Sequence, residues 1–375
     1  MFELLSEPGI AIVLTGALVG AAAALLGPFL ILRQNAMLAD AIAHAILFGI
    51  MVVWLLTGLV SGPVQIVGAG LAGVLCVWLT EALTRTGRVK QDAAIGLVFP
   101  VLFAVGVLML NLFARDVHID AHTVLLGEIG FVWLDLVKVP GGELPKALLW
   151  MGVVFAVNLA FVAIFWKELK LSTFDPVLAE AFGFLPRVLF YALLFLTSTT
   201  AVAAFDAVGV ILFIAFVIVP PSAAYLLTDR LGAMVGIGMT IAAASSAGGY
   251  ALAVLWDVSI GGMMALGTGV CFVAALLFGP RYGMLARFMR RRSEALGNDL
   301  RALMVHLASH EGEAAQGEEN LADALQTHLG WPKTRAQMVL ERSLTGGYIL
   351  RDGPALYLTE KGRQLAEALV EPWRR

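Results

Sequence analysis

Charged residues are scarce in the first three quarters of this chain. Residues 1–280 carry 27 Lys, Arg, Asp and Glu residues, whereas the last 95 residues carry 26. So low a density over such a length excludes a water-soluble domain, because the surface of such a domain is rich in these residues. The chain therefore meets two solvents, a lipid bilayer first and water in its C-terminal quarter.

Cysteines and nucleotide-binding motifs are also sparse or absent. The two cysteines, Cys76 and Cys271, lie in apolar segments without ligand-type spacing, which excludes a disulfide framework and a cysteine-based zinc site. The sequence has no Gly-x-x-x-x-Gly-Lys-Ser/Thr phosphate loop, so we expect no ATP hydrolysis by this chain. The start, "MFELLSEPG", lacks the basic region of a secretory signal, and the first apolar segment is expected to remain in the protein.

Long hydrophobic runs fill the first 280 residues instead. A hydrocarbon core of about 30 Å needs roughly 20 apolar residues per helix, so each run of that length predicts one span. The stretch 123–137 is too short and too charged to cross, and is expected to be re-entrant or interfacial. We expect an all-α polytopic membrane protein with about eight or nine transmembrane helices. The predicted spans are 10–32, 36–58, 64–83, 93–113, 146–166, 187–204, 208–227, 231–255 and 259–279.

The basic residues predict an orientation, because short loops rich in Lys and Arg stay in the cytoplasm. They fall on alternate sides of successive spans, which predicts an outside N-terminus and a cytoplasmic C-terminus. Glycines inside the spans, as in Gly16 to Gly20 and Gly68 to Gly73, are expected to let helices approach closely. The basic residues that set the orientation are Arg33; Arg85, Arg88 and Lys90; Lys167, Lys170 and Arg187; Arg230; and Arg281 to Arg292.

The C-terminal quarter has the pattern of a small soluble domain. We expect a transmembrane domain over 1–285, a basic linker over 286–298 that meets anionic lipid through Arg290 to Arg292, and a cytoplasmic domain over 299–375. In the last, a helix, a turn, a second helix, two strands around Asp352-Gly353 and a closing helix predict an α+β winged-helix module.

The charge of this tail bears on its partners. With 14 basic and 12 acidic residues between 281 and 375, it lacks the basic surplus that phosphate contacts need. A regulatory or protein-binding role is favoured over DNA binding. His306 and His310 lie one helical turn apart with Glu311 and Glu313 close behind, a pattern that fits either a metal-sensing site or a solvated helix face.

An ionisable pair lies inside the second predicted span. Asp40 and His44 are four residues apart, so they share one helix face. At 1.5 Å per residue, His44 lies about 16 Å from Arg33, near the bilayer midplane. Ionisable groups at that depth usually serve an ion or a proton, and oxygen and nitrogen ligands suit Mn²⁺, Fe²⁺ or Zn²⁺. The alternative is a pair that only hydrogen-bonds and stabilises packing.

A second polar cluster, "RDVHIDAHTVLLGE", lies in a predicted external connection. His118, Asp120 and His122, with Glu128 further on, are candidate ligands for a metal at the external mouth. A solvated polar loop fits the same residues.

Between two predicted spans lies the cytoplasmic stretch "KELKLSTFDPVLAEAFGFLPR". Asp175 followed by Pro176 is typical of a helix start, with the carboxylate at the N-cap and proline at the first position. A short protruding helix here predicts a docking site for a partner. An ordinary helix at the membrane surface is the alternative.

Three stretches together resemble the permease subunits of the zinc, manganese and iron uptake family of bacterial ABC transporters. They are "MLADAIAHAILFG", similar to the family's Gly-Asp-Ala-Leu-Ser-His-Ala segment, "DAAIGLVFPVLFAVGVLML" and "AFDAVGVILFIAFVIVPPSAAYLLTDRL". The resemblance covers about residues 10–280. It departs from the family pattern at Ala39, Ala43 and Phe48, which affects specificity more than function.

This resemblance implies that Asp40 and His44 coordinate the metal in the translocation path. It also implies a coupling helix that contacts the ATPase, and the residues assigned to that contact are Asp175, Pro176, Ala179, Glu180, Ala181, Phe182 and Gly183.

The resemblance further implies a set of partners in the bacterial cytoplasmic membrane. They are a second permease subunit, two cytoplasmic ATPase subunits and an external metal-binding protein. The metal ion is the substrate, and no cofactor is held permanently. The tail resembles the winged helix of metal-dependent repressors. Two alternative functions are an ion-coupled secondary metal carrier and a membrane-anchored winged-helix regulator.

Overall fold

The computed structural model describes residues 7–58, 63–113, 127, 129–139, 142–280, 282–312, 319–322 and 324–370. The chain forms two compact units, Met1–Gly283 and Met284–Arg375. Each unit has its own buried apolar core. They are described separately below.

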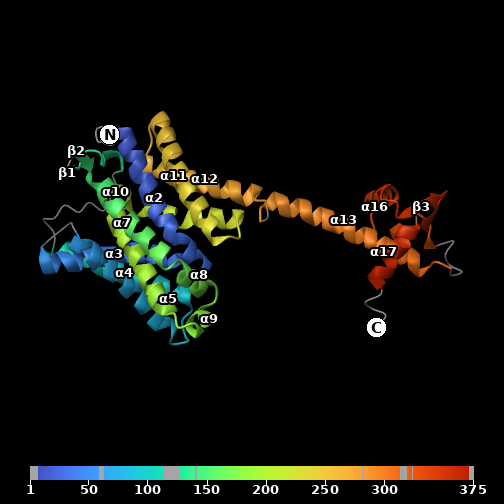
Figure 1. The fold of residues 1–375 in the computed structure, drawn as a ribbon, viewed down its shortest axis with the longest axis horizontal. Coiled ribbons are helices and arrows are strands. Elements are labelled where there is room, and N and C mark those ends of the chain that lie inside the picture. Colours follow the sequence, from blue (N-terminus) through green and yellow to red (C-terminus); the bar gives the residue numbers. More distant parts are fainter. Residues whose placement is uncertain are drawn as a thin grey trace. The chain divides into compact units, whose positions relative to one another are not determined.

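The first unit is a bundle of long helices (Figure 1). Among the described residues, nine helical segments are long and apolar enough to cross a membrane, and each lies within two residues of a span predicted from the sequence. The elements in chain order are α2 (Pro8–Leu32), α3 (Ala36–Thr57), α4 (Pro63–Thr84), α5 (Gln91–Phe113), η1 (Ile129–Phe131), β1 (Leu136–Val139), β2 (Gly142–Pro145), α7 (Lys146–Ile164), α8 (Trp166–Phe174), α9 (Pro176–Ala181), α10 (Pro186–Leu227), α11 (Leu231–Trp256) and α12 (Ile260–Phe278).

Helix α10 holds this unit together, because it packs against α2, α3, α4, α7, α11 and α12. It comprises two candidate spans, Pro186–Phe205 and Ala207–Leu227. Near the start of the second span, Gly209 has a φ of 70° in the left-handed region, which marks a kink in α10. Glycine adopts that conformation without the steric cost of a Cβ atom. The two spans therefore follow one another almost without a loop.

Small residues bring α2 and α11 close together, as the glycines of the first span predicted. A Cβ atom added at Gly20 would lie 2.8 Å from the Cβ of Ala242, closer than atoms normally approach. Ser246 of α11 donates a 2.9 Å hydrogen bond to the carbonyl oxygen of Val13. In lipid, where no hydrophobic effect drives helices together, such close packing and interhelical hydrogen bonds hold them.

One part of the first unit departs from the all-α prediction. Strands β1 and β2 form an antiparallel hairpin in which Leu136 pairs with Pro145 and Val139 with Gly142. Valine favours extended backbone, and strands of four residues leave too short a pattern to detect in a sequence. Residues 123–137 do not form a spanning helix where the structure describes them, since 129–131 is a single 3₁₀ turn.

The second unit contains the helices and the hairpin that the sequence predicted for it. Residues 286–298, predicted as a linker, lie within α13. Leu300, Leu303, Met304 and Leu307 form the buried stripe of α13, at the spacing of one helix face. The elements are α13 (Met284–Ser309), α15 (Ala324–His328), α16 (Lys333–Thr345), β3 (Ile349–Asp352), β4 (Ala355–Leu358) and α17 (Glu360–Val370).

A third extended segment, which the sequence did not reveal, completes this small sheet. Leu321 bridges to Ala355, and the backbone N–H of Leu356 donates to the carbonyl oxygen of Asn320 over 2.9 Å. The strands β3 and β4 turn at Gly353, which has a φ of 60°. Since Asp352 pairs with Ala355, the two-residue loop is Gly353-Pro354, and hairpin loops favour glycine at a first position with positive φ. The Asp352-Gly353 pair was the signal in the sequence that predicted the two strands.

Candidate functional site

Asp40 and His44 lie on the same face of α3, one turn apart, as their spacing requires. Most of their neighbours along the helix are fully buried, from Leu38 to Ala43. The two side chains themselves are 30% and 28% exposed in the single chain. Phe48, a further four residues along, is also only partly buried. The single chain therefore leaves this line of side chains, with its polar pair, partly open beside the buried residues of α3.

The two ionisable groups contact each other loosely. Nε2 of His44 lies 3.5 Å from Oδ1 of Asp40, beyond the usual hydrogen-bond range of about 2.7–3.2 Å. Two ligands on one tetrahedral zinc, with bonds of about 2.0–2.1 Å, are separated by about 3.3 Å. The oxygen and nitrogen therefore already have nearly the spacing that a shared metal ion needs.

Helix α5 holds the imidazole in place. The His44 ring stacks on Phe99 with 5.5 Å between ring centroids and meets Phe103 edge-on at 6.0 Å. Gly106 lies on the same face of α5, where a Cβ atom would be 2.8 Å from the backbone nitrogen of Phe48. The absence of a side chain there lets α5 approach α3 closely enough for the two phenylalanines to reach the ring.

Sequence reasoning did not single out these two phenylalanines. The signal was present, since Phe99, Phe103 and Gly106 recur at the four- and three-residue spacing of one helix face. That pattern does not indicate that this face packs against α3, however.

The candidate ligands at the external mouth, His118, Asp120 and His122, lie outside the described residues, as does Glu128. The one described residue between them, Gly127, packs its backbone against Val208 and Gly209 at the break in α10. Its φ of 66° is again one that glycine adopts readily.

The predicted docking segment consists of two short helices, α8 and α9. The N-cap prediction is confirmed: the Asp175 carboxylate accepts a 2.9 Å hydrogen bond from the backbone N–H of Leu178, and Pro176 occupies the first helical position. Ala179, a residue of α9, is buried. Of the other residues assigned to partner contact, Asp175, Pro176, Glu180, Ala181, Phe182 and Gly183 are exposed.

The exposed side of α9 is apolar. Val177 is 76% exposed, Phe182 at the C-cap is 68% exposed, and Leu185 at the N-cap of α10 is also exposed. Charged groups are few among them, Asp175 and Glu180 being those on α9 and its cap. Large apolar side chains presented together on a short helix are typical of a protein contact surface.

Arg33 anchors this segment to the rest of the bundle. Its guanidinium donates to Ser172 over 2.7 Å and to Thr173 over 3.2 Å, and it lies 5.2 Å from the centre of the Phe190 ring. Burial lowers the pKa of Arg33, but a guanidinium remains charged at any physiological pH. The end of α2, the end of α8 and the start of α10 therefore meet at one side chain.

Comparison with known proteins addresses the first unit directly. The family model described as "ABC 3 transport family" matches residues 9–279. A solved structure, PsaBC from Streptococcus pneumoniae in complex with Fab, is similar with a TM-score of 0.63 and 27% identity, covering 75% of this chain and 94% of that chain.

Two curated proteins are similar over longer alignments. The zinc transport system membrane protein TroD of Treponema pallidum is 42% identical over 360 residues, which are 96% of this chain and 98% of that protein. The manganese transport system membrane protein MntD of Bacillus subtilis is 42% identical over 280 residues, covering 74% of this chain and 95% of that protein. With a family model that covers the whole helical bundle and relatives this similar, the chain belongs to the ABC 3 transport family.

Proposed function

We propose that this chain is the permease subunit of an ABC importer that carries a divalent transition metal, Mn²⁺, Zn²⁺ or Fe²⁺, into the cytoplasm. Family membership and the similarity to transport proteins for zinc and manganese support this function over a secondary carrier or a membrane-anchored regulator. The nine candidate spans make it a multi-pass protein of the inner membrane. ATP is hydrolysed by a partner subunit, and the metal ion is substrate rather than a resident cofactor.

The observation that carries the metal path is the partly open line of side chains on α3. Asp40 and His44 supply one oxygen and one nitrogen at a spacing that suits a shared ion. Two ligands hold a divalent metal weakly, which is what passage requires. A second copy of the chain, related by a two-fold axis, would cover these side chains and add a second oxygen and nitrogen.

The packing of α5 supports this role for the pair. Aromatic rings on one side of His44 limit the directions in which the imidazole can turn, so its nitrogen is held toward Asp40 rather than toward a neighbouring helix. The apolar rings also exclude water from that side. A metal ion reaching the pair would then exchange part of its hydration shell for these two side chains.

The ATPase partners would dock on the exposed apolar side of α9. Asp175 fixes the start of this helix, Ala179 anchors it, and Arg33 ties α8 to α2. The set of partners comprises a second permease subunit, two ATPase subunits and an external metal-binding protein. In this arrangement α9 and the C-terminal unit lie in the cytoplasm, the N-terminus lies outside, and His118, Asp120 and His122 would receive the metal at the external mouth.

We assign the C-terminal unit a regulatory or protein-binding role on a winged-helix-like scaffold. The helix, helix, hairpin and helix order supports this fold, and the segment that bridges to β4 adds the third short strand. The alignment with TroD covers 96% of this chain. The alignment with MntD covers 95% of MntD but only 74% of this chain. The unit is therefore an addition to the transport core.

Replacing Asp40 by Asn tests the metal role. The substitution keeps the shape of the side chain and its ability to hydrogen-bond His44, but removes the negative charge that a divalent ion needs. We expect uptake of radioactive Mn²⁺ or Zn²⁺ to fall at least about tenfold in cells that contain the partner proteins, since even weaker perturbations of metal sites cost that much.

The matched control is Asp92→Asn, at an exposed position in the first turn of α5. It removes the same charge from the same bundle and should leave uptake unchanged. If Asp40→Asn reaches the membrane in normal amounts and transports as well as the parent, the pair serves packing alone and the proposed path is wrong.

A further inference from the structure

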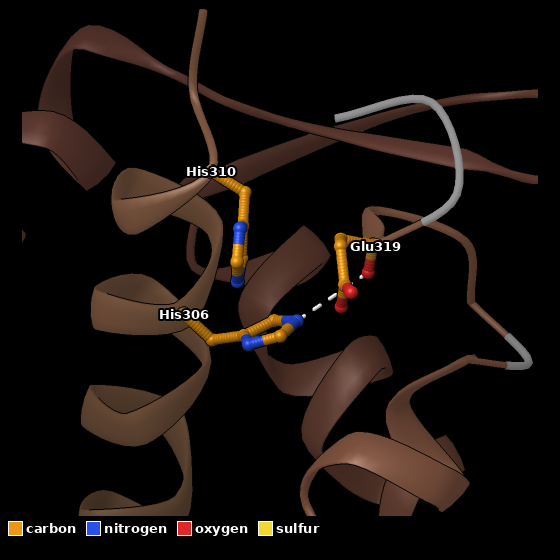
Figure 2. Close-up of side chains that lie close together, drawn as sticks. All are labelled: His306, His310 and Glu319. Atoms are coloured by element: carbon orange, nitrogen blue, oxygen red, sulfur yellow. Dashed lines mark hydrogen bonds between the residues drawn. The ribbon is translucent and has the colours of Figure 1, made fainter. Parts of the chain in front are cut away.

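A second group of potential metal ligands lies in the C-terminal unit, far along the chain from α3. His306 lies in the last turn of α13 and His310 directly follows the helix, Glu319 lies just before the small sheet, and His328 ends α15. One ligand atom from each of His306, His310 and Glu319 lies within 4.8 Å of the others (Figure 2). These three residues are called the C-terminal cluster below.

The sequence pointed to the two histidines but to the wrong carboxylates. Glu311 turns away to Arg363, with which it makes hydrogen bonds of 2.8–3.1 Å. Glu313 lies outside the described residues. Glu319, eight or more residues from the histidines along the chain, faces them instead (Figure 2).

The surrounding fold holds each member of the C-terminal cluster in place. Asn320, next to Glu319, accepts a backbone hydrogen bond from Leu356 of β4, so the glutamate projects from the edge of the sheet. The Glu311–Arg363 pair fixes the end of α13 beside His310. These two attachments converge on one small region, which differs from a helix face that merely meets solvent.

The distances are compatible with coordination after a small adjustment. Ligand atoms on a tetrahedral zinc lie about 3.3 Å apart, so the widest present separation has to close by about 1.5 Å. All three residues are partly exposed. The contact of 3.3 Å between Nε2 of His306 and the carbonyl oxygen of Glu319 is long for a hydrogen bond, so little is lost if a metal replaces it.

The chemistry of the group also suits a metal. Two imidazoles with one carboxylate match the ligands that zinc takes in proteins. Such a nitrogen-rich set favours Zn²⁺ over Mn²⁺, which prefers oxygen.

We propose that His306, His310 and Glu319 bind a divalent transition metal of the zinc type and that His328 positions the glutamate. Nδ1 of His328 contacts the Glu319 carboxylate, as outer groups around metal ligands commonly do. A bound ion would join α13 to the edge of the sheet. The C-terminal unit would thereby respond to the metal, at a site separate from the pair on α3.

The test uses the full chain in lipid nanodiscs, with Asp40→Asn, His44→Gln, His118→Gln and His122→Gln as background. Because the chain has six histidines, this background keeps only the three of the C-terminal unit. Zn²⁺ is titrated against a chromophoric chelator, and X-ray absorption reports the ligands. We expect one Zn²⁺ per chain with nitrogen and oxygen coordination. Because the pair on α3 is absent, this result does not depend on the transport role.

Each of His306→Gln, His310→Gln and Glu319→Gln should then weaken Zn²⁺ binding by at least about 100-fold. His328→Gln should weaken it less, by about tenfold, as expected for a positioning group. The control Glu341→Gln, at an exposed position on α16, should bind like the background protein.

Hydrogen–deuterium exchange gives a second readout in case a variant is unstable. Zn²⁺ should slow exchange over residues 319–328 in the background protein and not in Glu319→Gln. The proposal is overturned if the background protein binds no stoichiometric Zn²⁺, or if all three ligand variants bind it within twofold of the background.

Discussion

The close approach of α5 to α3 at Gly106 offers a sharp test of how Asp40 and His44 are positioned. In Gly106→Ala, the new methyl group would lie 2.8 Å from the backbone nitrogen and 3.0 Å from the Cα of Phe48. Non-bonded heavy atoms prefer about 3.5–4.0 Å. Since backbone atoms of α3 cannot rotate away, α5 has to move back by roughly 0.7–1 Å. Phe99 and Phe103 would move with it, away from His44.

Two opposing effects set the change in the free energy of unfolding. Overpacking of this kind costs about 1–3 kcal/mol, while alanine is favoured over glycine in a helix by about 1 kcal/mol. Gly96 is the matched control, because it lies on the same helix and a Cβ atom there meets nothing within 4 Å. Gly96→Ala should gain the helix preference without the clash. The two variants should therefore differ by about 1–3 kcal/mol in the free energy of unfolding.

Unfolding by SDS in mixed micelles, followed by tryptophan fluorescence, measures this difference. Metal uptake in cells gives the functional readout, and it should fall in Gly106→Ala and stay normal in Gly96→Ala at equal amounts of protein in the membrane. Equal stability and equal uptake of the two variants would refute the contact between α5 and α3 as described.

Three further predictions concern the docking segment and the C-terminal unit. Asp175→Ala removes the N-cap of α9 and should destabilise that helix by about 1 kcal/mol, lowering metal uptake, whereas Asp175→Ser keeps a capping oxygen and should restore most of it. Arg33→Gln loses the charged contacts to Ser172 and Thr173, and pull-down with the purified ATPase subunit should then recover less partner than with the parent. Arg335→Leu leaves the largely buried Asp299 without its two hydrogen bonds of 2.6 and 2.7 Å, and should lower the Tm of the C-terminal unit in calorimetry of the full chain.

The membrane spans could be read from the sequence because one physical quantity sets them. The thickness of the hydrocarbon core fixes the length of each apolar run, and polar or glycine-containing stretches end it. Even the two spans of α10 were separated correctly, although they form one continuous element with a kink at Gly209. The position of Asp40 and His44 on one helix face was equally predictable, because it depends only on the helical periodicity within one segment.

Features that depend on tertiary contacts could not be read in this way. The two phenylalanines on α5 show their own spacing but not the helix that they face. Glu319 joins the histidines at the end of α13 only because the bridge from Leu321 to Ala355 brings its segment to the sheet edge. The hairpin of β1 and β2 was missed because each strand has only four residues.

The anchoring of Arg33 has a mechanical consequence for the whole subunit. Its side chain grips the segment that carries α9, and α3 begins three residues later at Ala36, with Asp40 one turn further on. Through the Arg33 guanidinium, the segment that carries α9 is therefore connected to the start of α3, the helix that bears Asp40. Asp40 lies only seven positions after Arg33 in the sequence, so the segment that carries α9 and the carboxylate on α3 are linked by a short stretch of backbone.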